Sequence, residues 1–390
     1  MMERQGKHPM LPDNTHDESA RQMFVSGLKL HLANNISANL RTVYDKQVKP
    51  AIRRELGRDP ANRHDVRKTM SRDTTYQAWS SLQRTSQEMK QDTQSEIVLR
   101  QIETLADRAK QARRKARKGT LRTNPNIEIP RYVSAVSIHC IPGGYHNELI
   151  DDDVLPGAVF DPGVFLYSMG RMGAYNEDMG ATILSYLRQN RPGFAPKRIL
   201  DMGCSVGHST LPYVDAFPDA EVHALDIAGP FVRYAHARAE SMGKAVHFSQ
   251  QNAEATDYPD AHFDLIVSHI LMHETSHKAL ANIFAECHRL LKPGGLMVHA
   301  ETPTFEGMDP YDQFILDWDT YNNNEPFWGP LKDLDLAAFA AKQGFDKKKC
   351  FSKVQPSAVG EAYAKGRTSL FQAGDFGGAG AWFLFGAERG

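Results

Sequence analysis

The stretch that decides the fold is RILDMGCSVGHST, residues 198–210. Its apolar start is typical of a strand, and Gly203 and Gly207 then allow the backbone to turn tightly and approach a ligand. Asp201 offers a carboxylate that can accept a hydrogen bond from an ammonium group. A pyrophosphate-binding loop needs G-x-G-x-x-G, but here Ser205 stands where a glycine is usual. The loop alone leaves three interpretations open: a tight turn, a dinucleotide site, or a site for a cofactor without phosphates.

Strand-like and helix-like stretches alternate beyond this loop. The apolar runs lie at 198–202, 221–227, 245–249, 263–268 and 295–300, with amphipathic stretches between them. This alternation predicts a parallel sheet with helices on both faces. Two apolar runs near the C-terminus, at 348–354 and 381–389, predict an antiparallel pair at the sheet edge. We therefore expect an α/β fold, Rossmann-like, with a mostly parallel sheet of seven strands.

Four more motifs follow the loop and narrow its interpretation. EVHALDIAG contains Asp226 and Ile227 roughly twenty residues after the loop, and FSQQNAEAT contains Asn252 and Ala253. FDLIVSHILMHE and LLKPGGLMVHAE come next. With the glycine loop, these motifs resemble the class I S-adenosylmethionine-dependent methyltransferase family, small-molecule type, over about residues 170–390. The resemblance implies methyl transfer as the activity and S-adenosylmethionine as the cofactor.

The resemblance also implies which residues bind the cofactor. The acidic residue of the second motif, Asp226, would accept both ribose hydroxyls. Asn252 and Ala253 would contact the adenine, and Asn252 stands where the family more often has Asp. The full cofactor set implied is Asp201, Gly203, Ser205, Gly207, Asp226, Ile227, Asn252, Ala253, Ser268 and His269.

Two residues after the fourth strand are the catalytic candidates, His273 and Glu274. The methyl of a sulfonium is already activated, so the protein mainly has to align a nucleophile in a dry pocket. A base helps when the acceptor is a hydroxyl or a thiol, and an imidazole titrates near neutral pH. We expect His273 to act as base or to orient the substrate; the alternative is a helix-start histidine bonded to backbone.

An unusual segment at 302–333 is inserted after the fifth strand, where the family elaborates substrate lids. Its aromatic and acidic composition suits an aromatic ring or a cationic amine, although the aromatic residues could equally form a packed core. Upstream of the first motif, Tyr145 or His146 would cover the cofactor or substrate. The substrate contacts predicted are Tyr145, His146, Tyr311, Trp318, Tyr321, Phe327 and Trp328.

A metal site is not predicted. His139, Cys140 and His146 lie close in the sequence, but their spacing matches no standard metal site. The four cysteines of the chain form no C-x-x-C pair, and their scatter fits a reducing compartment.

The remaining sequence predicts the domain organisation. Residues 1–125 carry apolar residues at helical spacing and predict a helical domain that caps the site or pairs two copies in a homodimer. Residues 126–180 form a connector and lid, and 181–390 the methyltransferase domain. A basic segment at 108–122 is either an arm for RNA or a solvated helix end, and the absence of interleaved aromatic residues favours the helix end.

Charge and hydropathy limit the partners. The 46 Lys and Arg residues balance 47 Asp and Glu, so the overall charge gives no reason to expect nucleic acid. No apolar run is long enough to span a bilayer and no leader pattern is present, so we expect a cytoplasmic protein without a membrane partner. The leading hypothesis is transfer of a methyl group to O, N or S of a small molecule; the alternatives are an RNA methyltransferase and a non-catalytic partner subunit.

Overall fold

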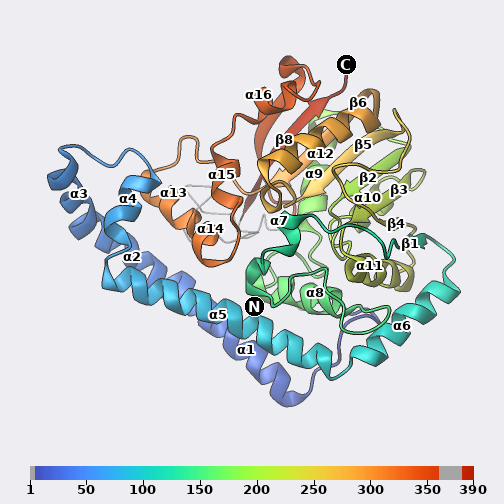
Figure 1. The fold of residues 1–390 in the computed structure, drawn as a ribbon, viewed down its shortest axis with the longest axis horizontal. Coiled ribbons are helices and arrows are strands. Elements are labelled where there is room, and N and C mark those ends of the chain that lie inside the picture. Colours follow the sequence, from blue (N-terminus) through green and yellow to red (C-terminus); the bar gives the residue numbers. More distant parts are fainter. Residues whose placement is uncertain (1–4, 360–379) are drawn as a thin grey trace.

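The fold centres on one mixed sheet of eight strands in the order β1-β4-β3-β2-β5-β6-β8-β7 (Figure 1). The structure is a computed structural model and describes residues 5–359 and 380–390; the predicted domains also include residues outside these ranges. The strands are β1 (Thr120–Arg122), β2 (Arg198–Met202), β3 (Glu221–Asp226), β4 (His247–Gln250), β5 (Phe263–His269), β6 (Leu291–Glu301), β7 (Cys350–Pro356) and β8 (Ala381–Glu388).

The topology confirms the expected α/β architecture. β1 to β6 are all parallel to one another, whereas β8 runs antiparallel to both of its neighbours, β6 and β7. The chain leaves β2 on one side toward β3 and β4, and returns on the other side of β2 as β5 and β6. The glycine loop after β2 therefore lies where the strand order reverses, which is where α/β sheets bind ligands.

The sheet has one strand more than expected, because the short β1 pairs in parallel with β4. Sequence gave no strong strand signal there, since the segment follows a run of cations. Glu240 at the end of α11 (Gly229–Ser241) accepts hydrogen bonds from the backbone N–H groups of Arg117, Lys118 and Gly119. These bonds hold the segment against the sheet edge, so a tertiary contact creates the strand.

Helices cover both faces of the sheet, as expected. One apolar core lies between the sheet and α9 (Asp178–Asn190), α10 (Leu211–Ala216) and α11. The opposite core lies under α12 (His277–Leu290) and α16 (Leu336–Ala341). α12 begins where the Ser276 hydroxyl accepts from the Ala279 N–H, and its apolar stripe of Leu280, Ile283 and Phe284 is fully buried.

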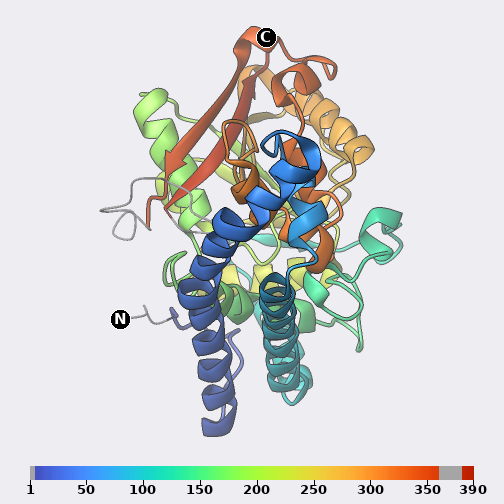
Figure 2. The same cartoon turned by 90° about the vertical axis from the view of Figure 1, so that its left-hand side faces the viewer.

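The N-terminal region is helical, and two long helices run side by side within it (Figure 2). Its helices are α1 (His16–His31), η1 (Leu32–Ile36), α2 (Ser37–Val43), η2 (Tyr44–Val48), α3 (Lys49–Leu56), α4 (Arg63–Met70), α5 (Thr74–Leu99) and α6 (Ile102–Lys115). The other short helices of the described chain are α7 (Arg131–Ser134), η3 (Ile138–Cys140), α8 (Leu155–Tyr167), η4 (Met272–Glu274), α13 (Pro310–Leu316), α14 (Trp318–Asn322), α15 (Trp328–Lys332) and η5 (Lys347–Lys349).

The N-terminal helices pack on the rest of the chain through two shared apolar cores. The end of α5 and the start of α6 bury Val98 and Leu105 against α8 and α11. Helices α2 to α5 form a second core with α13 and α14, in which Trp79 packs against Trp318. The N-terminal helices are therefore packed tightly on the rest of the chain. The domain bounds predicted from the sequence remain predictions. In the described residues, no helix has the length and hydropathy to cross a membrane.

Candidate active site

A cavity of about 330 Å³ lies at the carboxyl ends of the strands. The glycine loop and the ends of β3 and β4 line one part of it; the turn after β5, the lid, and helices α5 and α8 line the rest. Parallel strands bring their carboxyl ends to a common edge, so motifs far apart in the sequence meet here.

The glycine loop is built around the carboxylate of Asp226. Its Oδ2 accepts from the backbone N–H of Ser205 at 2.9 Å, and its Oδ1 from that of Ala228 at 2.9 Å. Gly203 and Ser205 have positive φ values of 70° and 46°, which aims the loop N–H back toward β3. Burial raises the pKa of Asp226 to about 6, and the nearby Asp201 adds to this shift.

Seven of the ten predicted cofactor residues line the cavity: Gly203, Ser205, Asp226, Ile227, Asn252, Ala253 and His269. They come from the loop after β2 and from the ends of β3, β4 and β5. The sequence motifs therefore predicted most of this wall.

The other three predicted cofactor residues lie behind the cavity wall. The Asp201 carboxylate accepts from the Thr210 hydroxyl at 2.6 Å and lies 3.2 Å from Nδ1 of His269. Ser268 shares a 2.7 Å hydrogen bond with Nδ1 of His299. Gly207 supplies a left-handed turn, with φ of 78°. These residues support the wall instead of lining it, because Asp201 and Ser268 form hydrogen bonds with other side chains and Gly207 forms the turn.

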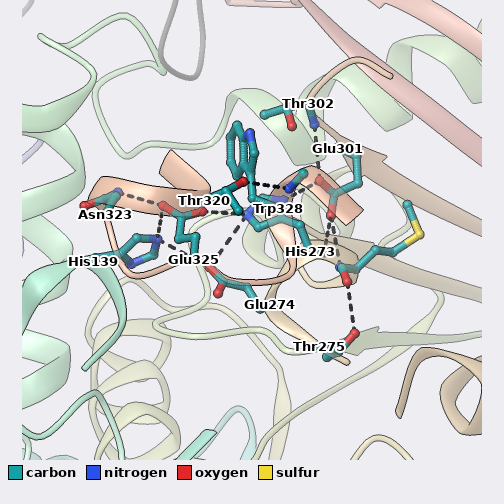
Figure 3. Close-up of polar contacts among 12 residues, drawn as sticks. His139, His273, Glu274, Thr275, Glu301, Thr302, Thr320, Asn323, Glu325 and Trp328 are labelled. Carbon is teal, nitrogen blue, oxygen red and sulfur yellow. Dashed lines mark hydrogen bonds and ion pairs between the residues drawn. The ribbon is translucent and has the colours of Figure 1, made fainter. Parts of the chain in front are cut away.

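At the other end of the cavity, His273 is held by a carboxylate that the motifs did not single out. Its Nδ1 lies 2.6 Å from Oε2 of Glu301, and Oε1 of Glu301 accepts from the backbone N–H of Met272 at 2.9 Å (Figure 3). Burial lowers the pKa of His273, but the charge and hydrogen bond of Glu301 outweigh it and the net shift is upward. His273 lies within η4, yet its ring is bonded to a side chain, which disfavours the backbone-bonded alternative.

The second nitrogen of His273 faces two carboxylates. Nε2 has no hydrogen-bond partner and lies 3.7 Å from Glu274 and 3.6 Å from Glu325. Burial raises the pKa of Glu274 to about 7. Burial, Asp319 and Glu274 together raise the pKa of Glu325 well above its usual value. The predicted catalytic pair thus lies in a wall of buried acids.

Helix α5 positions a second histidine ring, that of His139, in the same wall. The amides of Gln87 and Gln91 donate to the carbonyl oxygen of His139 at 3.3 and 3.0 Å. Nδ1 of His139 lies 2.8 Å from the Tyr145 hydroxyl, and its Nε2 lies 3.4 Å from both Glu274 and Glu325. His139 itself has a positive φ of 51°, a strained conformation that these bonds help to maintain.

The predicted substrate contacts divide into two groups. Tyr145, His146 and Trp328 line the cavity. Tyr311 and Trp318 are instead buried against the N-terminal helices, where the centres of the Tyr311 and Tyr44 rings lie 4.7 Å apart with the rings tilted by 34°. The structure therefore does not bring these two rings to the cavity, because helices α2 to α5 offer an apolar face that the aromatic side chains of the lid fill.

Two further lid aromatics also lie outside the cavity lining. Tyr321 is 56% exposed, with the Arg67 guanidinium 3.6 Å from its ring centre. Phe327 packs edge-on against Tyr132, which does line the cavity. The structure does not bring these two rings to the cavity lining, because the short helices of the lid turn them toward the surface and toward the connector.

Several residues of the site lay outside the sequence prediction. Glu301 lies behind the cavity wall at the end of β6, and its place at the carboxyl end of a strand was the signal that could have identified it. Glu325 and His139 line the cavity but were not among the predicted site residues, although His139 was weighed as a metal ligand together with Cys140 and His146. Lys90 and Tyr167 line the cavity from α5 and α8 and carried no motif.

The basic segment lies away from this cavity, and none of residues 108–122 lines it. Arg108 forms an ion pair with Asp13, and Arg122 with Asp257. Residues 108–115 form the end of α6, as the helix-end alternative expected, whereas the pairing of 120–122 as β1 was not expected.

Comparison with known proteins identifies a methyltransferase domain in the part of the sequence that contributes residues to this cavity. Residues 199–295 match a family model described as a methyltransferase domain. This segment belongs to the class I methyltransferases. It contains the glycine loop, Asp226, Asn252 and His273, so both ends of the cavity draw on the methyltransferase domain.

Named relatives of the methyltransferase domain differ in substrate. A demethylmenaquinone methyltransferase of Thermus thermophilus is 35% identical over 109 residues, covering 28% of this chain and 49% of the relative. A malonyl-[acyl-carrier protein] O-methyltransferase of Methylococcus capsulatus is 35% identical over 127 residues, covering 32% and 43%. The chain spans less than half the length of these two relatives.

A solved structure shows a more distant likeness. Phosphoethanolamine N-methyltransferase 2 of Haemonchus contortus, in complex with S-adenosyl-L-methionine, is 17% identical with a TM-score of 0.39. The match covers 59% of this chain and 57% of that one.

Proposed function

We propose that this chain is an enzyme that transfers the methyl group of S-adenosylmethionine to an O, N or S atom of a small molecule. The observation that carries the proposal is that a single cavity joins the methyltransferase loop and Asp226 at one end to His273 and its buried acids at the other. The substrates that the relatives' names give, demethylmenaquinone, malonyl-[acyl-carrier protein] and phosphoethanolamine, support the activity class and no single acceptor.

The cofactor end supplies the contacts that the proposal requires. Asp226 uses one lone pair on each oxygen for backbone N–H groups, and a carboxylate has about four lone-pair positions. The remaining positions suit the two ribose hydroxyls. Asn252 and Ala253 line the adjoining wall, where the adenine would lie.

The end of the cavity that holds His273, here called the acceptor end, favours a nucleophile that must lose a proton. Glu301 holds Nδ1 of His273, which orients the ring and stabilises its positive charge once Nε2 has taken a proton. The rings of Tyr132, Phe160 and Trp328 form part of the wall, and Glu274 adds a carboxylate. Such a wall suits an aromatic or amine-bearing acceptor.

The experiment is a methyl-transfer assay in metabolite extracts with isotope-labelled S-adenosylmethionine, followed by mass spectrometry of labelled products. Calorimetry with S-adenosylmethionine and S-adenosylhomocysteine runs in parallel. We expect binding of both ligands and one dominant labelled product, while His273→Ala should bind the cofactor normally and transfer the methyl slowly. Absence of binding to either ligand would overturn the proposal, and unchanged turnover in His273→Ala would remove the base from it.

A further inference from the structure

Three side chains from separate parts of the chain place ligand atoms around one point of the acceptor end (Figure 3). His139 comes from the connector, Glu274 from the turn after β5, and Glu325 from the lid. Nε2 of His139 lies 3.4 Å from a carboxylate oxygen of each glutamate, and all three ligand atoms lie within 4.8 Å of one another. We refer to His139, Glu274 and Glu325 as the triad.

Buried polar atoms at the triad lack the partners that burial normally requires. The Glu325 side chain is only 3% exposed, yet its Oε2 has no hydrogen-bond partner. Oε2 of Glu274 and Nε2 of His273 are also unpartnered, and the His273 side chain is 1% exposed. In the described chain, no lysine or arginine forms an ion pair with Glu274 or Glu325. In the described residues only the imidazoles of His139 and His273 lie within ion-pair distance of these two carboxyl groups, so an added positive ligand would stabilise their ionised forms.

The distances distinguish a metal ion from an ammonium group. Ligands about 2.1 Å from a tetrahedral ion lie about 3.4 Å from one another. Acceptors that bind an ammonium group at about 2.8 Å would lie about 4.6 Å apart in the same arrangement. The two distances from His139 are 3.4 Å, which matches the metal.

The surroundings of the triad also resemble those of a metal ligand set. The Tyr145 hydroxyl lies 2.8 Å from Nδ1 of His139, and in the tautomer in which Nδ1–H donates to that oxygen, Nε2 keeps its lone pair free. Asn323 donates to Oε1 of Glu325 at 2.7 Å and orients that carboxylate. Hydrogen bonds of this kind orient the ligands of protein metal sites.

The geometry points to a divalent transition-metal site, for an ion such as Zn²⁺ or Mn²⁺, held by His139, Glu274 and Glu325. Three protein ligands leave a further coordination position, as in catalytic sites. His273, 3.6 and 3.7 Å from the two carboxylates, borders that position without being one of the triad. Where the proposed methyl transfer holds, a bound cation would lower the pKa of an acceptor hydroxyl or thiol beside His273.

The test is metal binding by the full-length protein without cofactor or substrate. The protein is stripped with a chelator and dialysed against Zn²⁺, and the metal is counted by mass spectrometry. We expect roughly one ion per chain. Replacing a residue that only orients a ligand typically lowers metal affinity by roughly 10- to 100-fold, and we expect a loss of this size for Tyr145→Phe. His139→Ala and Glu325→Gln remove a ligand and should lower the metal affinity by more than that. Addition of Co²⁺ should give a visible absorption band that the two ligand variants lose.

Matched controls are His277→Ala and Glu306→Gln, two exposed residues of the same types outside the cavity. Thermal unfolding checks that each variant is folded, and Glu274→Gln, which keeps the side-chain volume, provides a third ligand variant. Metal content equal to that of the chelated blank, or unchanged affinity in folded ligand variants, would overturn the inference. Calorimetry with S-adenosylmethionine separates the proposals: cofactor binding without metal binding would overturn the metal site alone, and the reverse result would overturn only the proposed function.

Discussion

Replacing Asp226 by Asn tests the cofactor end most directly, because the substitution preserves shape and removes the charge. In the wild-type protein both carboxylate oxygens accept loop N–H groups at 2.9 Å. The amide keeps one oxygen and turns an NH₂ group toward either Ser205 or Ala228, so one of these buried N–H groups loses its acceptor. An unsatisfied buried donor costs about 1–3 kcal/mol, which we expect as a loss in the free energy of unfolding.

The same substitution should weaken cofactor binding by a separate amount. A hydrogen bond to a charged acceptor contributes about 1.5–3 kcal/mol, and the amide can replace only one of the two expected from the ribose. The Kd for S-adenosylmethionine should therefore rise by roughly 10- to 100-fold. Calorimetry measures the Kd, and urea unfolding measures the stability.

The control for this experiment is Asp219→Asn, whose side chain is 88% exposed. It should change neither quantity beyond error. A Kd within about twofold of wild type in Asp226→Asn would refute the ribose role, since the loss of a charge-assisted hydrogen bond is worth more than that. Weakened folding with unchanged cofactor affinity would mean that Asp226 serves only to hold the loop.

Three further predictions concern pH, orientation and stability. Because the pKa of Asp226 is about 6, its carboxylate is ionised above that pH. Cofactor affinity should therefore be constant above about pH 7 and fall by up to roughly tenfold per pH unit below pH 6. Calorimetry at several pH values measures this dependence, which should be absent in Asp226→Asn. Glu301→Gln should slow methyl transfer by roughly 10- to 100-fold in single-turnover assays with cofactor Kd unchanged, because His273 loses the charge that orients it; equal rates would contradict this role. Arg63→Met should lower the free energy of unfolding by about 3 kcal/mol, because Arg63 donates a 3.1 Å hydrogen bond to the buried Asp317. Arg21→Met removes only an exposed ion pair and should lower it by less than about 1 kcal/mol. Urea denaturation compares the two, and equal losses would contradict a role for Arg63 in joining α4 to the lid.

The parallel sheet and one wall of the cavity followed from the sequence alone. Strand periodicity and helix punctuation are local signals, and they placed β2 to β8 within a few residues. The glycine loop was also predictable, because a tight turn requires glycine at particular positions, and the resemblance to the methyltransferase family singled out the acid that ends β3. These signals do not depend on what packs against the sheet.

The acceptor end depended on tertiary structure. Whether Trp318 faces a substrate or a core was decided by the apolar surface of the N-terminal helices, which no local pattern records. His139 and Glu325 lie 186 positions apart in the numbering and meet only because α5 and the lid enclose the same cavity. Local periodicity determines which elements form, whereas the meeting of distant side chains is determined by the burial of surfaces shared between those elements.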